Sequence, residues 1–119
     1  MWNEPTKKQL DALPGLYDTE DISTDDKIVH MHFFIGGSDW WITEFDGKDL
    51  FFGYARLSGM EDFAEWGYMS FRELKDLKVT REIRNSHLEL IPMIYEIDHD
   101  IHWRPKPFSE IHLSSIAQN

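Results

Sequence analysis

The chain contains no cysteine in its 119 residues. Disulfides, thiolate metal sites and a cysteine nucleophile are therefore excluded, and a reducing compartment suits such a chain, so we expect a cytoplasmic protein. No apolar run approaches the roughly 20 residues of a membrane helix, and the first residues lack the charged start and apolar stretch of a signal peptide. We therefore expect a soluble protein that has no membrane partner.

The sequence also lacks the motifs of the common catalytic classes. It has no Gly-x-Gly-x-x-Gly pattern, no Walker pattern and no nucleophile elbow around a serine. Gly36-Gly37 is too short for a phosphate loop and has no lysine beside it. Hydrolase, kinase and dinucleotide chemistry have no positive support, and no cofactor is expected.

Positive charge is scarce, with 12 Lys and Arg against 22 Asp and Glu, which gives a formal net charge of −10. Such a charge repels phosphate backbones, so direct nucleic-acid binding is not expected. A partner that is itself basic, or a local basic patch, remains compatible with it. The acidic residues that we consider candidates for contacting a partner are Asp18, Glu20, Asp21, Asp25 and Asp26.

Length and a hydrophobic content of 41% predict one globular domain, residues 1–119. Within it, capping signals, alternating apolar residues and prolines define four segments. They are an N-terminal helix and acidic loop over residues 1–26, antiparallel strands over 27–71, a helix over 71–84, and an edge strand with an extended tail over 85–119. This order predicts an α+β fold in which helices pack on one face of a small antiparallel, meander-like sheet.

The strand signals are clearest before residue 57. Residues 28–35 alternate between a wholly apolar face and a mixed face, and Asp46-Gly47 is a strong hairpin signal. A two-residue turn there would place Glu44 opposite Asp49, and like charges in that position destabilise a sheet. The pair could be solvated or could bind a cation, or the loop could have four residues and a different register.

Two histidines offer a candidate metal site. His30 and His32 lie two residues apart on one face of a predicted strand, which is a spacing at which two imidazoles can reach one ion. Asp100 and His102 could complete the ligand set, and Glu44 could act as a general base in a small metal-dependent enzyme. The alternative is that these are half-buried histidines with ordinary hydrogen bonds.

Aromatic and basic side chains raise two further possibilities. Trp40 and Trp41 belong either to the core or to a surface that contacts a partner, because tryptophan anchors many interfaces. The basic residues Arg72, Lys75, Lys78, Arg81 and Arg84 recur every three positions. On the predicted helix they form either a solvated face paired with acids or a patch for nucleic acid.

Several ordered motifs together carry a resemblance. They are Glu44-Phe45-Asp46, Phe52-Gly53-Tyr54, Glu65-x-Gly67-Tyr68, Ser70-x-x-Glu73-Leu74 and Asp100-x-His102. In this order the chain resembles the bacterial domain of unknown function 2958 family over most of residues 7–111, although residues 80–97 are longer than the family pattern expects. The resemblance implies a small cytosolic protein that is often encoded on plasmids, phages and other mobile elements, without an established activity or cofactor.

These observations favour a non-catalytic interaction module that binds another macromolecule, most naturally a protein. In its sharper version the chain is an acidic inhibitor or nucleic-acid mimic of the anti-restriction or anti-CRISPR type, with carboxylates where phosphates would lie. The hypothesis from another class is the small metal-dependent enzyme. The two predict different surroundings for His30 and His32.

Overall fold

Antiparallel strands dominate the structure, a computed structural model that describes residues 2–57 and 64–111; 44% is strand and the helices are short. The strands are β1 (Ile28–Val29), β2 (Met31–Ile35), β3 (Ser38–Phe45), β4 (Leu50–Arg56), β5 (Glu65–Ser70), β6 (Lys78–Arg84), β7 (Leu90–Glu96), β8 (Asp98–His99) and β9 (Lys106–Pro107). The helices are α1 (Lys7–Asp11), the 3-10 turn η1 (Thr24–Asp26) and α2 (Phe71–Lys75). The predicted antiparallel sheet is confirmed, whereas the helices are shorter than predicted.

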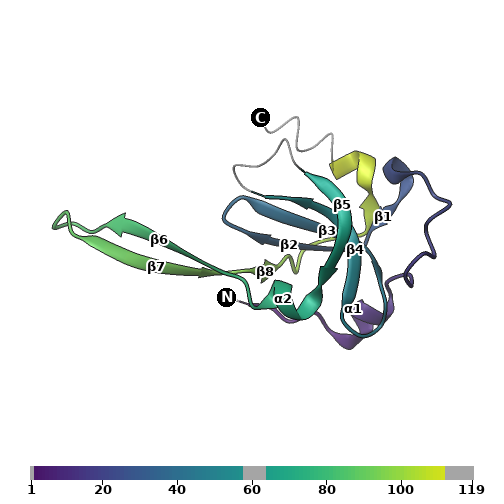
Figure 1. The fold of residues 1–119 in the computed structure, drawn as a ribbon, viewed down its shortest axis with the longest axis horizontal. Helices are drawn as coiled ribbons and strands as arrows, with labels where there is room; N and C mark the ends of the chain where they lie inside the picture. The colour runs from purple at the N-terminus through teal and green to yellow at the C-terminus, as the bar shows by residue number, and fades with distance from the viewer. Residues whose placement is uncertain (1, 58–63, 112–119) are drawn as a thin grey trace.

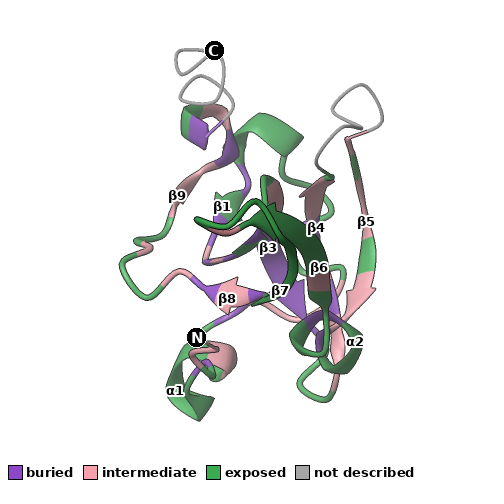
Figure 2. Cartoon of the chain, turned by 90° about the vertical axis from the view of Figure 1, so that its left-hand side faces the viewer, coloured by how far each residue is buried: buried purple, intermediate pink, exposed green. Residues whose placement is uncertain are grey.

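Three sheets result from this chain order (Figure 1). The body holds a five-stranded sheet in the order β5-β4-β3-β2-β8 and a two-stranded sheet of β1 and β9, while β6 and β7 pair only with each other. The alternation predicted for residues 28–35 is present, because Val29, Met31, Phe33 and Ile35 are all buried. Burial is concentrated in β2, β3 and β4 (Figure 2).

Apolar clusters lie against the body's strands in two groups. The larger cluster is built around Phe33, Ile42 and Phe51, and α2 contributes Phe71 and Leu74 to it. The smaller cluster contains Val29, Trp41, Phe108 and Ile111. Helix α1 has no buried residue, and its Thr6–Gln9 capping box forms as predicted.

The β3–β4 hairpin has the longer of the two predicted loops. Strand β3 ends at Phe45 and β4 begins at Leu50, so Asp46 to Asp49 form a four-residue connection, and Glu44 pairs with Phe52. The Asp46 carboxylate accepts hydrogen bonds from the backbone N–H groups of Lys48, Asp49 and Leu50 at 2.7, 2.8 and 3.0 Å. These three bonds lower the pKa of Asp46. Because Glu44 pairs with Phe52 and not with Asp49, the predicted repulsion between the carboxylates of Glu44 and Asp49 is avoided.

The β6–β7 pair forms a ribbon that projects from the body (Figures 1 and 2). Every residue of both strands except Val79 is exposed. The predicted helix over 71–84 is therefore wrong beyond Lys75: the β-branched residues Val79, Thr80 and Ile83 favour a strand, and basic residues three apart do not require a helix. The ribbon stretches the molecule to 56 × 32 × 24 Å with a radius of gyration of 15.8 Å, whereas a compact domain of this length has about 13.5 Å.

None of the helices in the described residues is long and apolar enough to cross a membrane.

Candidate functional site

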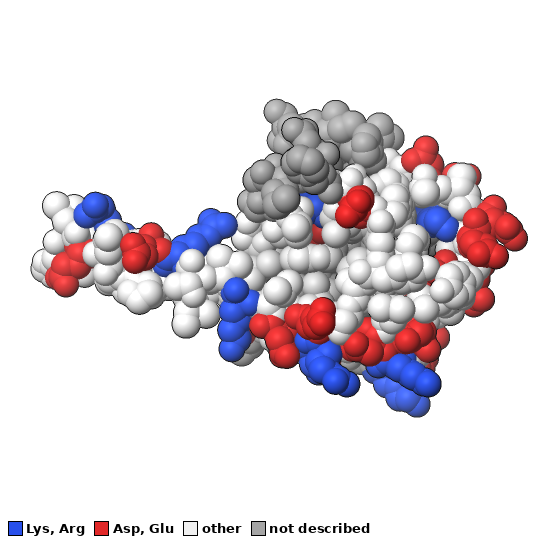
Figure 3. All heavy atoms as spheres, viewed as in Figure 1, with Lys and Arg blue, Asp and Glu red and all other residues white. Residues whose placement is uncertain are grey.

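The five predicted acidic contacts lie between α1 and β1, at the end of the body away from the ribbon. All of them are exposed, and acidic side chains gather at this end of the molecule (Figure 3). Asp18 accepts a hydrogen bond from the Gly15 backbone N–H at 2.9 Å, and Asp26 accepts one from the Ser23 hydroxyl at 2.9 Å. We call residues 15–27 the acidic segment. Its carboxylates are available to a partner.

A pocket of about 380 Å³ lies between the acidic segment and the sheet. On the sheet side, Glu44 on β3 pairs with Phe52 on β4, and Phe52 pairs with Tyr68 on β5. Residues that pair across strands point to the same face, so these three side chains form a row. The segment side supplies Tyr17, Glu20 and Lys27.

A β-bulge brings Glu44 into this row. The β3–β4 register shifts between Ile42 and Glu44, so that Thr43 is the extra residue. Ile42 pairs with Gly53 and Phe45 with Phe51 on the core face, and the bulge returns Glu44 to the other face. Strict alternation would have put Glu44 on the face of Ile42. Bulges often redirect a side chain next to a functional site in this way.

Glu44 fixes the acidic segment to the sheet. Its carboxylate accepts hydrogen bonds from the Tyr17 N–H at 2.9 Å, from the Thr19 N–H at 3.1 Å and from the Thr19 hydroxyl. The Lys27 ammonium donates to the Thr19 carbonyl and, at 3.0 Å, to the Thr19 hydroxyl. Glu44 and Lys27 are only 3% and 6% exposed. Two buried charges thus share one bridging residue, which offsets the cost of their burial.

Two tyrosines stand at the mouth of the pocket. Tyr17 has a φ of 70°, a left-handed conformation that is uncommon for a residue with a side chain. The neighbouring Tyr17 side chain, desolvation and the nearby charges of Glu44 and Glu20 raise the pKa of Tyr68. Strained backbone of this kind is concentrated at functional sites. Sequence reasoning missed Tyr17, Thr19 and Lys27, because their contacts span 8 to 27 residues.

The predicted role of Glu44 as a general base is not supported by these contacts. Among the described residues, none of its hydrogen bonds reaches a predicted metal ligand, and its acceptors serve the acidic segment. Glu44 holds the loop in place.

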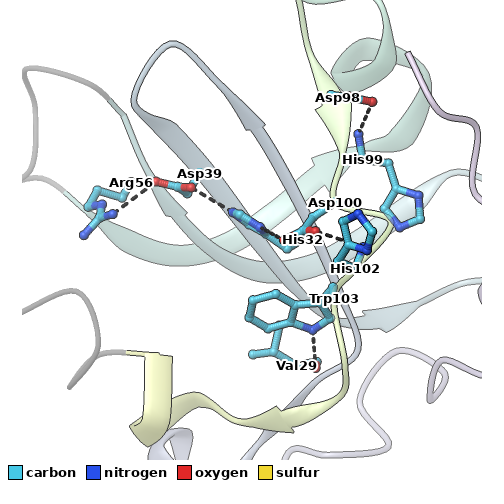
Figure 4. A network of polar contacts seen from close by, with 9 residues as sticks. All are labelled: Val29, His32, Asp39, Arg56, Asp98, His99, Asp100, His102 and Trp103. Atoms are coloured by element: carbon cyan, nitrogen blue, oxygen red, sulfur yellow. Dashed lines mark hydrogen bonds and ion pairs between the residues drawn. The ribbon is translucent and has the colours of Figure 1, made fainter. Parts of the chain in front are cut away.

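His32 is the centre of a separate polar network (Figure 4). Its Nε2 lies 2.8 Å from Asp39 Oδ1, and its Nδ1 lies 3.2 Å from Asp100 Oδ2. Asp39 also accepts a hydrogen bond from Arg56 at 3.1 Å. The imidazole stacks on Trp41 with ring centroids 5.5 Å apart. The network links β2, β3 and β4 to the segment that follows β8.

The predicted metal ligands do not assemble into a site. Both ring nitrogens of His32 face carboxylates, His30 is half-buried with its pKa lowered by desolvation, and His102 is exposed. Among residues 2–57 and 64–111, no group of three His, Asp or Glu side chains is placed to hold a metal ion. The alternative of ordinary hydrogen-bonded histidines fits the geometry better.

Sequence reasoning did not identify His99 as a buried residue, yet it is 4% exposed and packs on Phe33 with ring centroids 5.4 Å apart. Burial lowers the pKa of His99, against a smaller opposing effect of a hydrogen bond to the Asn3 backbone. The burial of His99 could have been inferred from the pairing of Asp98 and His99 with the apolar end of β2.

Trp40 and Trp41 are buried, at 8% and 5% exposure. Trp40 belongs to the larger apolar cluster and Trp41 to the smaller one, where Arg56 lies 5.2 Å from its ring centroid. The structure therefore does not support their predicted contact with a partner.

The five basic residues do not form a helical stripe. Arg72 and Lys75 lie on α2, and the other three lie on β6, where Lys78 and Arg84 share one face and Arg81 occupies the opposite face. Lys78 also pairs with Glu96 across the ribbon. A continuous basic patch for nucleic acid is thus not present here.

Comparison of the chain with protein-family models, with curated proteins and with solved structures finds no match. The resemblance to the domain of unknown function 2958 family stays a prediction from the sequence.

Proposed function

We propose that this protein is a non-catalytic interaction module that binds a basic protein, and that the β6–β7 ribbon is its main apolar contact. The observation that carries the proposal is the exposure of apolar side chains along a ribbon whose contacts with the described body include Val79 against the larger apolar cluster and Arg81 on the Gly36 carbonyl, while its apolar residues beyond Val79 stay exposed. Its exposed apolar residues are Ile83, Leu88, Leu90, Ile91, Met93, Ile94 and Tyr95.

The ribbon is an unfavourable structure unless something covers it. A two-stranded hairpin on its own is marginally stable in water, and contiguous exposed apolar patches mark interaction sites. Leu90 and Ile94 are 55% and 66% exposed, and β6 and β7 each have one partner strand, so each leaves one edge unpaired. An apolar groove or a strand edge on a partner could therefore engage both the side chains and the backbone.

Charge favours a basic protein as the partner. Residues 78–96 contain three basic residues, Lys78, Arg81 and Arg84, and three acidic ones, Glu82, Glu89 and Glu96. The ribbon thus has no net charge to attract phosphates, while the whole chain carries −10. A partner that normally binds nucleic acid fits both surfaces, with the acidic segment in the place of phosphates.

The test compares partner capture by the full chain and by two matched variants. Leu90→Ser with Ile94→Ser removes apolar area from the ribbon, and Ile101→Ser removes a side chain of similar exposure, 59%, from the body. We expect the unaltered chain and Ile101→Ser to retain the same basic protein, and the ribbon variant to lose it. High salt should weaken the retention.

Equal retention by all three proteins would refute the proposal. Recovery of nucleic acid alone would do so as well. A dimer detected by light scattering, and dissociated by the ribbon substitutions, would instead identify a second copy as the occupant and would also overturn the proposal.

A further inference from the structure

We propose that the pocket between the acidic segment and the Glu44–Phe52–Tyr68 row binds an organic cation, namely an alkylammonium or guanidinium group. This inference does not depend on the ribbon or on its partner. It rests on the walls, the charge and the rigidity of the pocket.

The walls are aromatic on three sides. Tyr17, Phe52 and Tyr68 line the pocket, and the rings of Phe52 and Tyr68 lie 5.0 Å apart at 56° to each other. The faces of aromatic rings attract ammonium and guanidinium groups, so a cavity lined by three aromatic side chains favours such a cation. The volume of about 380 Å³ lies within the range of small-ligand sites.

The charged groups at the pocket favour a cation over an anion. Glu20 and Glu44 contribute two negative charges against the single positive charge of Lys27. Lys27 already donates to Thr19 at two acceptors, and the surrounding segment adds Asp18 and Asp21.

The pocket is held open by contacts that a ligand need not supply. Glu44 fixes the backbone at Tyr17 and Thr19, and Tyr17 is held in a left-handed backbone conformation. A site that is formed before binding loses less entropy when the ligand arrives. Tyr17 and Tyr68 are nevertheless 61% and 52% exposed, so a ligand can reach the pocket from solvent.

The test is a titration of the full chain followed by backbone amide NMR, with tetramethylammonium chloride and propylguanidinium chloride as probes. Sodium chloride at equal ionic strength corrects for screening, and tert-butanol serves as a neutral molecule of similar size. We expect both cations to shift the amides of Tyr17, Phe52 and Tyr68 with saturation, and tert-butanol to shift them much less.

Two variants link the binding to the pocket. Tyr68→Leu removes one aromatic face and should weaken cation binding roughly tenfold, while Glu20→Gln should weaken it a few-fold. Phe34→Leu, at an aromatic residue of 40% exposure on β2, should leave binding unchanged. Unperturbed amides outside the pocket show that each variant has folded.

The source of the cation follows from a further pair of titrations. Saturable binding of acetyl-Gly-Arg-Gly-amide at least as tight as that of propylguanidinium would assign the pocket to a side chain of a protein. Binding of propylguanidinium alone would assign it to a free small molecule. No saturable shift with either cation, equal binding of tert-butanol, or unchanged affinity in Tyr68→Leu would overturn the inference.

Discussion

The link between Glu44 and Lys27 through Thr19 allows a quantitative prediction about stability. Glu44→Gln preserves the size of the side chain but removes the charge, and its amide NH₂ then meets a backbone N–H of the acidic segment that needs an acceptor. Removing one partner of a buried charged network costs about 3–5 kcal/mol, because the other charge is left uncompensated. Since glutamine still accepts one hydrogen bond, we expect a loss of about 3 kcal/mol in the free energy of unfolding.

A double-mutant cycle separates this link from general damage. Lys27→Met keeps the length of the side chain and removes the other charge, and we expect a similar loss. The double variant has no buried charge at this position, so it should be about 1–2 kcal/mol more stable than the sum of the two losses implies. Glu20→Gln is the matched control, because Glu20 is an exposed glutamate in the same segment, and its effect should stay within about 0.5 kcal/mol.

The assay is urea unfolding at pH 7, followed by fluorescence of the five tryptophans. A change of midpoint with an unchanged m-value reports stability alone. The reasoning would be refuted by a loss below about 1 kcal/mol for Glu44→Gln, or by strict additivity in the double variant.

Three further predictions concern the sheet, the buried histidine and the ribbon. Gly53→Ala should destabilise the protein by roughly 3 kcal/mol or more in urea unfolding, because its Cβ would lie 2.1 Å from the Trp41 carbonyl oxygen. Gly67→Ala is the control and should cost far less, because the space around Gly67 is open. Equal losses of stability in the two variants would contradict the structure. Burial lowers the pKa of His99 below its ordinary value of 6.5. The unfolded chain therefore binds a proton at His99 more readily than the folded chain does, so the free energy of unfolding should fall as the pH drops below 6.5 towards the lowered pKa. His99→Gln should flatten this dependence in urea titrations between pH 7.5 and 5, and an unchanged slope would show that His99 is not responsible. Backbone amides of β6 and β7 should exchange with deuterium faster than those of β3, because the ribbon buries so little apolar surface; slower exchange in the ribbon would show that it is covered in the free protein.

The body of the sheet could be predicted because its signals are local. The alternation of β2 follows from residues two apart, and the four-residue loop is one of the three alternatives that the charge clash between Glu44 and Asp49 raised. The ribbon could not be predicted in the same way. Both faces of the ribbon are exposed, so the sequence of β6 shows no apolar alternation. Its basic residues recur every three positions, a spacing that is also typical of a helix.

The candidate site depends on features that no local pattern contains. The bulge at Thr43 decides which face Glu44 occupies, and the partners of Glu44 lie 25 and 27 residues earlier in the chain. The His-x-His pattern left open both a metal site and ordinary hydrogen bonds, although the partner of His32 was within reach of sequence reasoning. The two-residue turn at Gly36 and Gly37 brings Asp39 back towards His32.

The bulge in β3 also determines how this chain tolerates a change of length. Loss of Thr43 would remove one buried side chain and its hydrogen bond to the Phe52 carbonyl, but it would produce a regular strand in which Ile42 still pairs with Gly53 and Glu44 still pairs with Phe52. Loss of Ile42 would move Thr43 into an apolar cluster in its place. Thr43 is thus the residue of β3 whose deletion the fold can best accommodate, and shorter natural variants of this strand should lack this position.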